Sequence, residues 1–389
     1  MQIDELAAGG DGVGRGPDGR VVFVPFTAPG DRIRVQIVDR QARFSRGRVE
    51  TLLRAGPARI DPVCPVYGSC GGCAWQHVSY PAQLEAKVAI VTAALHRIGG
   101  LVPPTPTITP SPKPFGYRSR SRALASRGRV GYRRRRSHTL CATSHCPLLV
   151  DKLDQSLAEL ANESPPDGEW ELSLGYTQEG VRTSRVSRLP GRKGKHAPQK
   201  DSQRLSLRVG GNQISFSEGV FVQSNAALLD PLIKAVNLAA GRGQLAFDLF
   251  AGAGFLTLGL AAQFETVLAV EANPVAARDL EWNITNAEIE GVSVIAESVE
   301  VAIANRRFEG FDPEVIVIDP PRSGLPTGVA ESLASIGPRR FVYLSCDSAT
   351  LARDLSVLAL WDYQLTSVQA FDLFPQTPHV EVLAVAQRK

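Results

Sequence analysis

Long apolar runs are missing from this chain of 389 residues, and so is a strong excess of either charge. A helix that crosses a bilayer needs about 20 apolar residues, and no segment approaches that length. The N-terminal stretch MQIDELAAGGDG carries acids and no apolar core, so we expect no signal peptide and a cytoplasmic location. Because the net charge is only +4, any nucleic-acid surface must come from local clustering of charge.

Cysteine is also scarce, with six in the chain. In a cytoplasmic protein these point to metal binding or catalysis rather than to disulfides. No internal repeat is visible, and a hydrophobic content of 43% with 21% charged residues is that of an ordinary globular protein. A chain of this length has room for two or three domains.

Residues 1–55 alternate short β-prone runs with glycine-rich turns. The runs Val21–Val24, Ile33–Ile37 and Gly47–Leu52 read as strands, and Pro29-Gly30 is one of the turns between them. Several short strands at this spacing predict a small β-barrel.

Four cysteines form a candidate metal site. Cys64, Cys70 and Cys73 lie close together, and Cys146 follows much later. Four thiolates suit either zinc or an iron–sulfur cluster. Zinc sites more often use two C-x-x-C pairs, so the three-plus-one spacing favours a cluster. Cys141 could be the fourth ligand instead, but we interpret it as a spare thiol.

A band of nine arginines falls within positions 117–136. Alternating arginines on a strand would turn one face toward a polyanion, and Tyr117 and Tyr132 offer stacking surfaces. A solvated basic face is the plainer interpretation. A second basic stretch, residues 182–204, predicts a loop that touches RNA.

From Leu245 onward, strands and helices alternate as in a parallel α/β domain. The buried strand Leu245–Phe250 is followed by the turn AGAG and a helix from Phe255, and the next strand ends in Glu271, where an acid would accept ribose hydroxyls. A dinucleotide fingerprint needs a further glycine where Thr257 stands. The site therefore suits a single nucleoside such as S-adenosylmethionine better than NAD.

The stretch Phe341–Leu355 predicts a strand that delivers Cys346 just before a helix beginning near Thr350. At that position the helix dipole would favour the thiolate, although most free cysteines are simply buried. The strand Val315–Ile318 leaves Asp319 at the same sheet edge. Glu381 begins the last strand, where a carboxylate must be paired or functional.

Together these pieces resemble the RNA 5-methyluridine methyltransferases, in the iron–sulfur branch that carries a TRAM domain. The resemblance rests on the four cysteines and on GGDGVGR, FVQSN, DLFAGAG, DPPR, SCDSATLARDL and FPQTPHVE. It implies that Cys346 is the nucleophile and Glu381 the general base. It implies a [4Fe-4S] cluster on Cys64, Cys70, Cys73 and Cys146, and S-adenosylmethionine bound by Gln223, Phe250, Phe255, Glu271, Ser298 and Asp319. The family often has Asn where this chain has Phe255, and SCNPATL where it has SCDSATL.

The resemblance implies a TRAM-like barrel in 1–55, a central RNA-binding α+β domain with the cluster in 56–215, and a Rossmann-like methyltransferase domain in 216–389. The expected reaction is methylation of carbon 5 of a flipped-out uridine through a Cys346 adduct at carbon 6. We expect 23S ribosomal RNA as the target, with transfer RNA as the alternative. A non-catalytic RNA-binding protein of the same fold is the competing class. We expect a monomer with no membrane partner.

Overall fold

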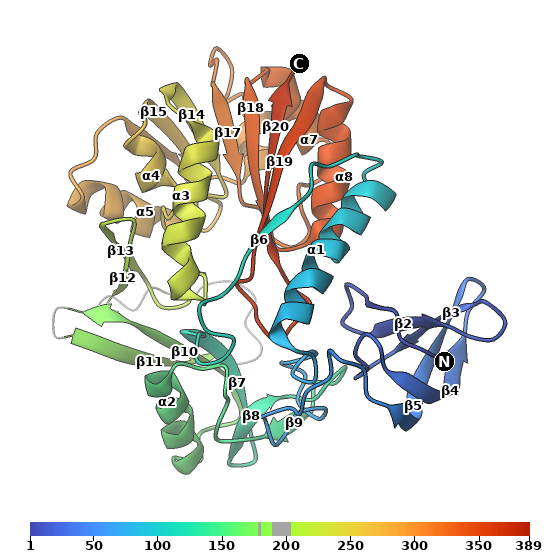
Figure 1. The fold of residues 1–389 in the computed structure, drawn as a ribbon. Coiled ribbons are helices and arrows are strands. Elements are labelled where there is room, and N and C mark those ends of the chain that lie inside the picture. The colour runs from blue at the N-terminus through green and yellow to red at the C-terminus, as the bar shows by residue number, and fades with distance from the viewer. Residues whose placement is uncertain (178–179, 189–203) are drawn as a thin grey trace.

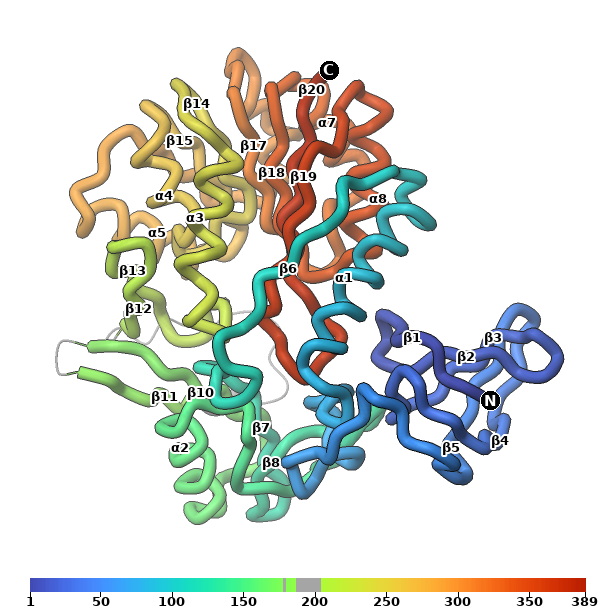
Figure 2. Tube along the Cα trace, in the orientation of Figure 1, coloured from blue at the N-terminus to red at the C-terminus, as the bar shows by residue number. Residues whose placement is uncertain are grey.

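The computed structural model describes residues 1–177, 180–188 and 204–389, and within them the chain forms three β-sheets. Figure 1 shows a small N-terminal sheet, a central sheet, and a large sheet flanked by helices. Figure 2 follows the chain from the N-terminal sheet through helix α1 (Tyr80–Arg97) to the large sheet and back into the central sheet. Most of the second basic stretch, residues 189–203, lies outside the described residues.

The N-terminal sheet has the strand order β1-β2-β3-β5-β4. Its strands are β1 (Glu5–Leu6), β2 (Gly12–Arg15), β3 (Val21–Val24), β4 (Arg32–Arg40) and β5 (Phe44–Arg54). Ile3, Val22 and Ile33 pack inside it, and a bridge between Gln2 and Arg32 brings its two ends together. The three strands expected here are confirmed, with β4 and β5 longer than the sequence suggested.

The central sheet has the order β13-β12-β10-β7-β8-β9, with β11 also paired to β10. Its strands are β7 (Arg120–Ser126), β8 (Arg129–Arg133), β9 (Leu140–Ala142), β10 (Gly168–Thr177), β11 (Gly180–Arg188), β12 (Leu205–Val209) and β13 (Asn212–Phe216). Helix α2 (Asp151–Asn162) buries Leu153, Leu157 and Leu160 against it. These residues recur every three or four positions, as on one helix face.

The large sheet has the order β16-β15-β14-β17-β18-β20-β19-β6. The strands are β6 (Thr107–Thr109), β14 (Gly243–Leu249), β15 (Phe264–Val270), β16 (Val292–Ile295), β17 (Val315–Ile318), β18 (Arg340–Ser345), β19 (Tyr363–Phe371) and β20 (Glu381–Arg388). From β16 to β18 they run parallel, whereas β20 is antiparallel to both neighbours. This is the predicted Rossmann-like arrangement.

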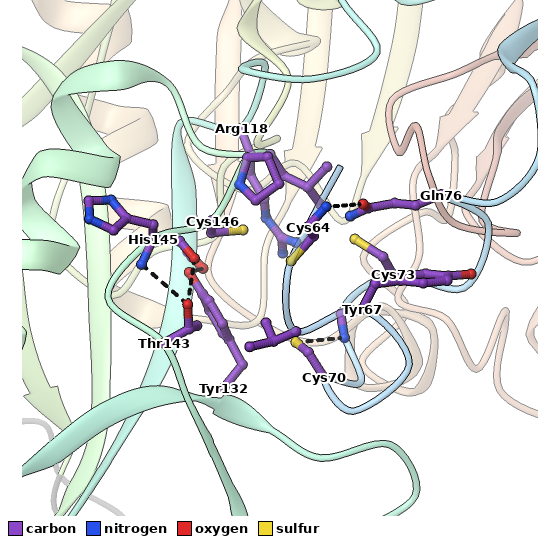
Figure 3. A pocket seen from close by; sticks show the side chains of 15 residues that line it. Cys64, Tyr67, Cys70, Cys73, Gln76, Arg118, Tyr132, Thr143, His145 and Cys146 are labelled. Atoms are coloured by element: carbon purple, nitrogen blue, oxygen red, sulfur yellow. Dashed lines mark hydrogen bonds between the residues drawn. The ribbon is translucent and has the colours of Figure 1, made fainter. Parts of the chain in front are cut away.

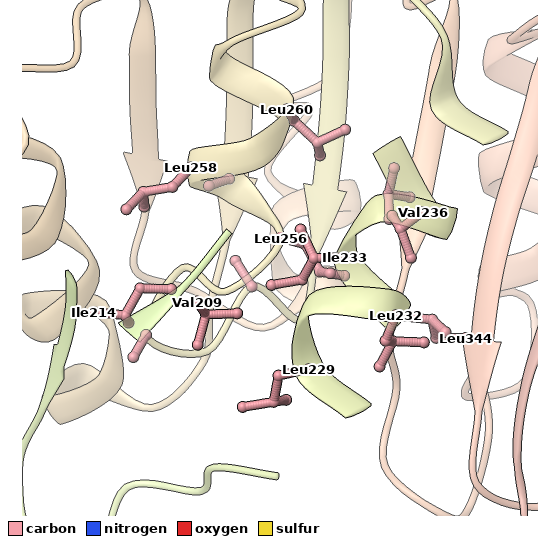
Figure 4. Packing of buried hydrophobic residues seen from close by; sticks show 14 of the residues in the cluster. Val209, Ile214, Leu229, Leu232, Ile233, Val236, Leu256, Leu258, Leu260 and Leu344 are labelled. Atoms are coloured by element: carbon pink, nitrogen blue, oxygen red, sulfur yellow. The ribbon is translucent and has the colours of Figure 1, made fainter. Parts of the chain in front are cut away.

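Helices cover both faces of the large sheet. Besides α1 they are η1 (Ala226–Leu228), α3 (Leu229–Ala240), α4 (Thr257–Ala261), α5 (Pro274–Asn286), α6 (Val299–Ala304), α7 (Val329–Ile336) and α8 (Ser348–Ala359). The core is divided into two hydrophobic clusters, one on each face of the sheet. In strand β18, Val342 and Leu344 belong to the first cluster, and Phe341 and Tyr343 belong to the second. Figure 4 shows part of the first cluster, to which α3, α4 and β18 contribute side chains, with Leu232 of α3 beside Leu344 of β18. Each such side chain contributes about 1.5–3 kcal/mol when fully buried.

Residues 80–109 pack differently from the expectation that placed them in the central domain. Val91 and Leu95 of α1 are buried against the large sheet, and Thr107 of β6 pairs with Gln369 of β19. The chain therefore contributes a helix and an edge strand to the large sheet before it enters the central one. Among the described residues, no helix is both long and apolar enough to cross a membrane.

Candidate active site and cysteine pocket

Three neighbouring strands of the large sheet, β14, β17 and β18, end at the same edge. Phe250 follows β14, Asp319 follows β17, and Cys346 follows β18. The strand order reverses at β14, since β15 lies on one side of it and β17 on the other. Open α/β sheets bind their ligands in the crevice at such a reversal.

The turn after β14 has the geometry of a ligand cradle. Phe250, Gly252 and Gly254 all have positive φ, at 64°, 58° and 95°. A side chain on Gly254 would lie 2.5 Å from a methyl of Leu280, whereas the space above Gly252 is open. The backbone N–H of Gly252 donates to Glu271 Oε2 at 2.8 Å, so the acid at the end of β15 fixes the turn. The helix that we expected from Phe255 begins only at residue 257.

Asp248 lies beneath this turn as a buried carboxyl. Its position in the sequence did not indicate a role. Its side chain accepts a hydrogen bond from Thr257 Oγ1 at 2.6 Å, while its Oδ1 has no partner among the described residues. Burial, together with the charges of Asp319 and Glu271, raises the pKa of Asp248 to about 7. Thr257, which replaces the glycine of a dinucleotide fingerprint, therefore has a structural role in binding this carboxyl.

Cys346 lies between β18 and α8, as predicted. The helix begins at Ser348 because the Asp347 side chain accepts the N–H groups of Ala349 and Thr350, at 3.0 and 3.1 Å. Burial and the charge of Glu381 raise the pKa of the Cys346 thiol to about 11, although Arg322 opposes this with its charge and a hydrogen bond. The expectation of a thiolate favoured by the helix dipole is therefore wrong for the free protein.

Glu381 lies at the start of β20 and is only 1% exposed. Burial and the neighbouring Asp319 raise its pKa well above the usual range, while Arg322 and a hydrogen bond with Gln223 act against this rise. Burial also raises the pKa of Asp319 to about 7. The structure thus brings Cys346, Glu381, Asp319 and Gln223 together, and Arg322 joins them.

The other residues assigned to the cofactor lie along the same side of the sheet. Ser298 caps α6 by accepting the N–H of Val301 at 3.3 Å. Phe255 packs against the hydrophobic core, and Phe250 follows β14 with a partly buried side chain. Phe221, the first residue of the FVQSN motif, lies two residues before Gln223 and has a side chain that is 69% exposed.

Cys64, Cys70, Cys73 and Cys146 line one cavity of about 50 Å³, which we call the cysteine pocket. Figure 3 shows these side chains gathered around it, three from the loop before α1 and one from the segment before α2. The N–H of Gly72 donates to Cys70 Sγ at 3.4 Å. Cys141 is buried in β9 and is not among the residues that line the pocket.

A single metal ion does not fit this pocket as it stands. Within the described ranges, no three Cys, His, Asp or Glu side chains are grouped closely enough to hold one ion. A tetrahedral zinc site with Zn–S bonds of about 2.3 Å would require sulfurs about 4 Å apart. The cavity is several times larger than the roughly 10–15 Å³ that one water molecule needs, so it offers room for a larger group.

Comparison with known proteins places the chain in a family. A profile described as tRNA (Uracil-5-)-methyltransferase matches residues 171–389, more than half of the chain, and a TRAM domain profile matches residues 2–49. The chain belongs to the tRNA (uracil-5-)-methyltransferase family. It is an S-adenosylmethionine-dependent RNA (uracil-5-)-methyltransferase with an N-terminal TRAM domain.

Relatives of this methyltransferase match it over nearly its whole length. An uncharacterised RNA methyltransferase of Nostoc is 32% identical, over 99% of this chain and 95% of that protein. Another from Gloeobacter violaceus is 33% identical, over 100% of this chain and 96% of that protein. The fold is similar to that of the Pyrococcus abyssi tRNA (uracil-54, C5)-methyltransferase, with a TM-score of 0.75, 24% identity and 99% coverage of both chains.

Arg322 lies in the candidate site of this methyltransferase, although the sequence did not show which residues surround it. It ends the DPPR motif, and its charge acts on both Cys346 and Glu381. The motif itself was visible as two prolines that stop β17, but nothing in it indicated which side chains the guanidinium would face. That information requires the relative placement of β17, β18 and β20.

Proposed function

We propose that this enzyme methylates carbon 5 of a uridine through a covalent adduct at carbon 6, with Cys346 as nucleophile and Glu381 as general base. The observation that carries the proposal is the meeting of these two side chains from separate strand ends. Glu381 lies close enough to Cys346 for its charge to be among the causes of the raised pKa of that thiol. The positive charge of Arg322 acts to lower the pKa of both side chains.

The chemistry explains why a thiol and a carboxylate are both needed. Carbon 5 of uracil is a weak nucleophile, and addition of the Cys346 sulfur at carbon 6 converts the ring to an enolate that can attack from carbon 5. S-adenosylmethionine, when bound, would supply the methyl group on a sulfonium cation, with S-adenosylhomocysteine as the leaving group once the methyl–sulfur bond breaks. Glu381 then takes the proton from carbon 5, the carbon–sulfur bond breaks, and the thiolate leaves. The buried position of Glu381 means that the uridine must leave its stack to reach it.

The same edge supports our assignment of the cofactor residues. Gly252 leaves open space above the turn, and Glu271 keeps a carboxylate beside it. A carboxylate there would accept the ribose hydroxyls of the nucleoside. We place the remaining contacts on Gln223, Phe250, Phe255, Ser298 and Asp319. Asp319 and Glu381 would stabilise a bound cation once ionised.

We propose 23S ribosomal RNA as the substrate, with transfer RNA as the competing target. The layout of a TRAM domain followed by a cysteine-containing domain supports the ribosomal target. The transfer-RNA alternative is the one that the family description and the Pyrococcus abyssi enzyme name. Mapping 5-methyluridine in both RNA classes from a deletion strain decides between them. Loss from neither class would refute methylation of uridine by this enzyme.

The covalent step has its own test. Wild-type enzyme should form a stable complex with RNA containing 5-fluorouridine, because fluorine at carbon 5 cannot be removed as a proton is. Cys346→Ala should bind the same RNA without forming the complex. A wild-type enzyme that methylates uridine but forms no such complex would contradict the adduct.

We further propose that the cysteine pocket holds a [4Fe-4S] cluster with a structural role. The proposal is supported by four thiols that line one cavity, three close in the sequence and one distant, rather than two C-x-x-C pairs. Protein purified without oxygen should be brown and contain iron and sulfide, and Cys73→Ser should lose both. Colourless protein that contains zinc would refute the assignment. The proposed domain limits are 1–55, 56–215 and 216–389, with residues 80–109 of the central segment packed on the large sheet. The monomer and the cytoplasmic location remain predictions.

A further inference from the structure

Residues 372–380, which we call the catalytic loop, connect β19 to β20 and lead directly into Glu381. The loop contains no helix or strand, yet Asp372, Leu373 and Gln376 are almost fully buried. A buried segment without secondary structure must satisfy its polar groups elsewhere. Its position relative to the nucleophile therefore depends on contacts from distant parts of the chain.

Gln376 is the residue through which most of these contacts pass. Its backbone has a φ of 68°, in the left-handed region that few side chains adopt. Its carbonyl oxygen accepts the N–H groups of Ala74 and Trp75, both at 3.0 Å. Its Nε2 donates to the carbonyl of Pro114 at 3.3 Å. The loop is thus bonded directly to the segment that follows Cys73.

Gln83 of α1 completes the arrangement. Its Oε1 accepts the backbone N–H of Gln376 at 2.9 Å, and its Nε2 donates to Gln376 Oε1 at 3.0 Å. The same Nε2 lies within hydrogen-bond distance of the carbonyls of Trp75, at 3.2 Å, and Val78, at 2.8 Å. One buried amide therefore fixes both the main chain and the side chain of Gln376. No other glutamine within the described residues forms such a pair with the catalytic loop.

Further contacts hold the loop on either side of this pair. Lys87, one helical turn after Gln83, donates to the carbonyl of Phe374 at 3.0 Å and forms a buried ion pair with Asp372. Tyr117 donates to the carbonyl of Pro375 at 3.1 Å. These bonds restrain residues 372–375, whereas the Gln83–Gln376 pair is the last anchor before the segment that ends in Glu381.

We propose that Gln83 and Gln376 are positioning residues that place Glu381 for removal of the carbon-5 proton. The inference rests on the proposed role of Glu381 as the base. Neither glutamine reaches the reacting atoms through the contacts described; each acts through the backbone of the catalytic loop. The pair is specific to the second half of the reaction, because the nucleophile comes from a different strand.

The test uses the variant Gln83→Met, which keeps the length of the side chain but loses every hydrogen bond to the catalytic loop. Trapping and turnover are measured separately, because they report on different halves of the reaction. Trapping on RNA with 5-fluorouridine requires Cys346 and the methyl donor but no proton removal. Turnover on natural uridine RNA requires Cys346, the methyl donor and removal of the carbon-5 proton. We expect trapping within about twofold of wild type and a kcat lowered about 10- to 100-fold, the effect of a misplacement near 1 Å. KM for RNA should be unchanged.

Two further variants keep the test decisive. Gln376→Asn retains a residue that tolerates positive φ but is too short to hold both amide contacts. It should show the same division between trapping and turnover, and it carries the test if Gln83→Met does not fold. Tyr363→Phe is the control, because it loses a buried hydrogen bond to Pro338 at the opposite edge of the sheet. It should leave both measurements unchanged.

The possible results separate the inference from the function on which it rests. With natural uridine RNA, Gln83→Met should accumulate the covalent complex, as a slow base would. Trapping and turnover that fall together in Gln83→Met and Gln376→Asn would show a general structural role and overturn the inference. Unchanged turnover in both would also overturn it. A wild-type enzyme that forms no trapped complex would remove the proposed function, and the inference with it.

Discussion

Replacing Arg322 by methionine should raise the pKa of the Cys346 thiol and slow its alkylation. Arg322 favours the thiolate through its positive charge and a hydrogen bond, but burial and Glu381 leave the pKa at about 11. Only the thiolate reacts with an alkylating reagent. At pH 8, about three units below that pKa, the thiolate is roughly one part in 10³.

The size of the effect follows from two opposing trends. Loss of an opposite charge at close range changes a pKa by about 1–3 units, so the thiolate fraction falls at least about tenfold. A thiolate of higher pKa is also more nucleophilic, with a Brønsted slope of about 0.4–0.5. The two trends combine to a net slowing of about threefold for each unit of pKa. From pH 7 to 10 the thiol of both proteins is below its pKa, so the expected result is this net slowing at each pH and not a displaced midpoint.

The measurement is the rate of alkylation of Cys346 by iodoacetamide from pH 7 to 10, read by mass spectrometry of the peptide that contains it. The protein is full-length and free of RNA. Arg306→Met is the matched control, because Arg306 is exposed and pairs only with Glu309 among the ion pairs of the described residues. Equal profiles for Arg322→Met and wild type would refute the assignment of Arg322 to the thiol.

Three further predictions concern the carboxyls of the site. Glu381→Gln should still add Cys346 to natural uridine RNA but stall there, so a covalent complex should accumulate on denaturing gels; free RNA alone would contradict its role as base. Burial raises the pKa of Asp248 from 3.8 to about 7, so its cost to folding grows as pH rises through that range. The free energy of unfolding of Asp248→Asn minus that of wild type, measured by urea titration, should therefore be about 2–3 kcal/mol larger at pH 8 than at pH 5. Because burial raises the pKa of Asp319 to about 7, calorimetric affinity for S-adenosylmethionine should rise about tenfold from pH 6 to 8, whereas S-adenosylhomocysteine, which lacks the sulfonium charge, should change less.

The parts of the site that lie on single strand–turn–helix units could be predicted from sequence. Cys346 lies after β18 and before α8, and the glycine turn lies after β14, as expected. The register of α8 differed by two residues, because Asp347 caps the helix earlier than its apolar pattern begins. Local hydrogen bonds of this kind are readable from residue type, since Asp is among the preferred N-cap residues.

The assignment of residues 80–109 to a sheet could not be predicted, because periodicity shows that a helix has an apolar face but not what covers it. Helix α1 packs on the large sheet although the cysteines before it belong to the central region. Strand β6 has only three residues in a proline-rich segment, too few for any pattern. Strand β6 depends on pairing with β19, and α1 on packing against α8, both more than 250 residues later in the chain.

The charge state of Cys346 shows why a motif can identify a site and still give its electrostatics wrongly. The strand–helix junction suggested a thiolate, because only the helix dipole can be read from the sequence. In the structure the thiol also faces Glu381, which arrives from β20, and burial disfavours any charge there. Dipole effects are about 0.3–1 kcal/mol when exposed, whereas desolvation of a buried group can shift a pKa by several units. Cys346, the proposed nucleophile, is therefore a neutral thiol in the free protein, and we expect its activation to accompany the arrival of RNA and methyl donor.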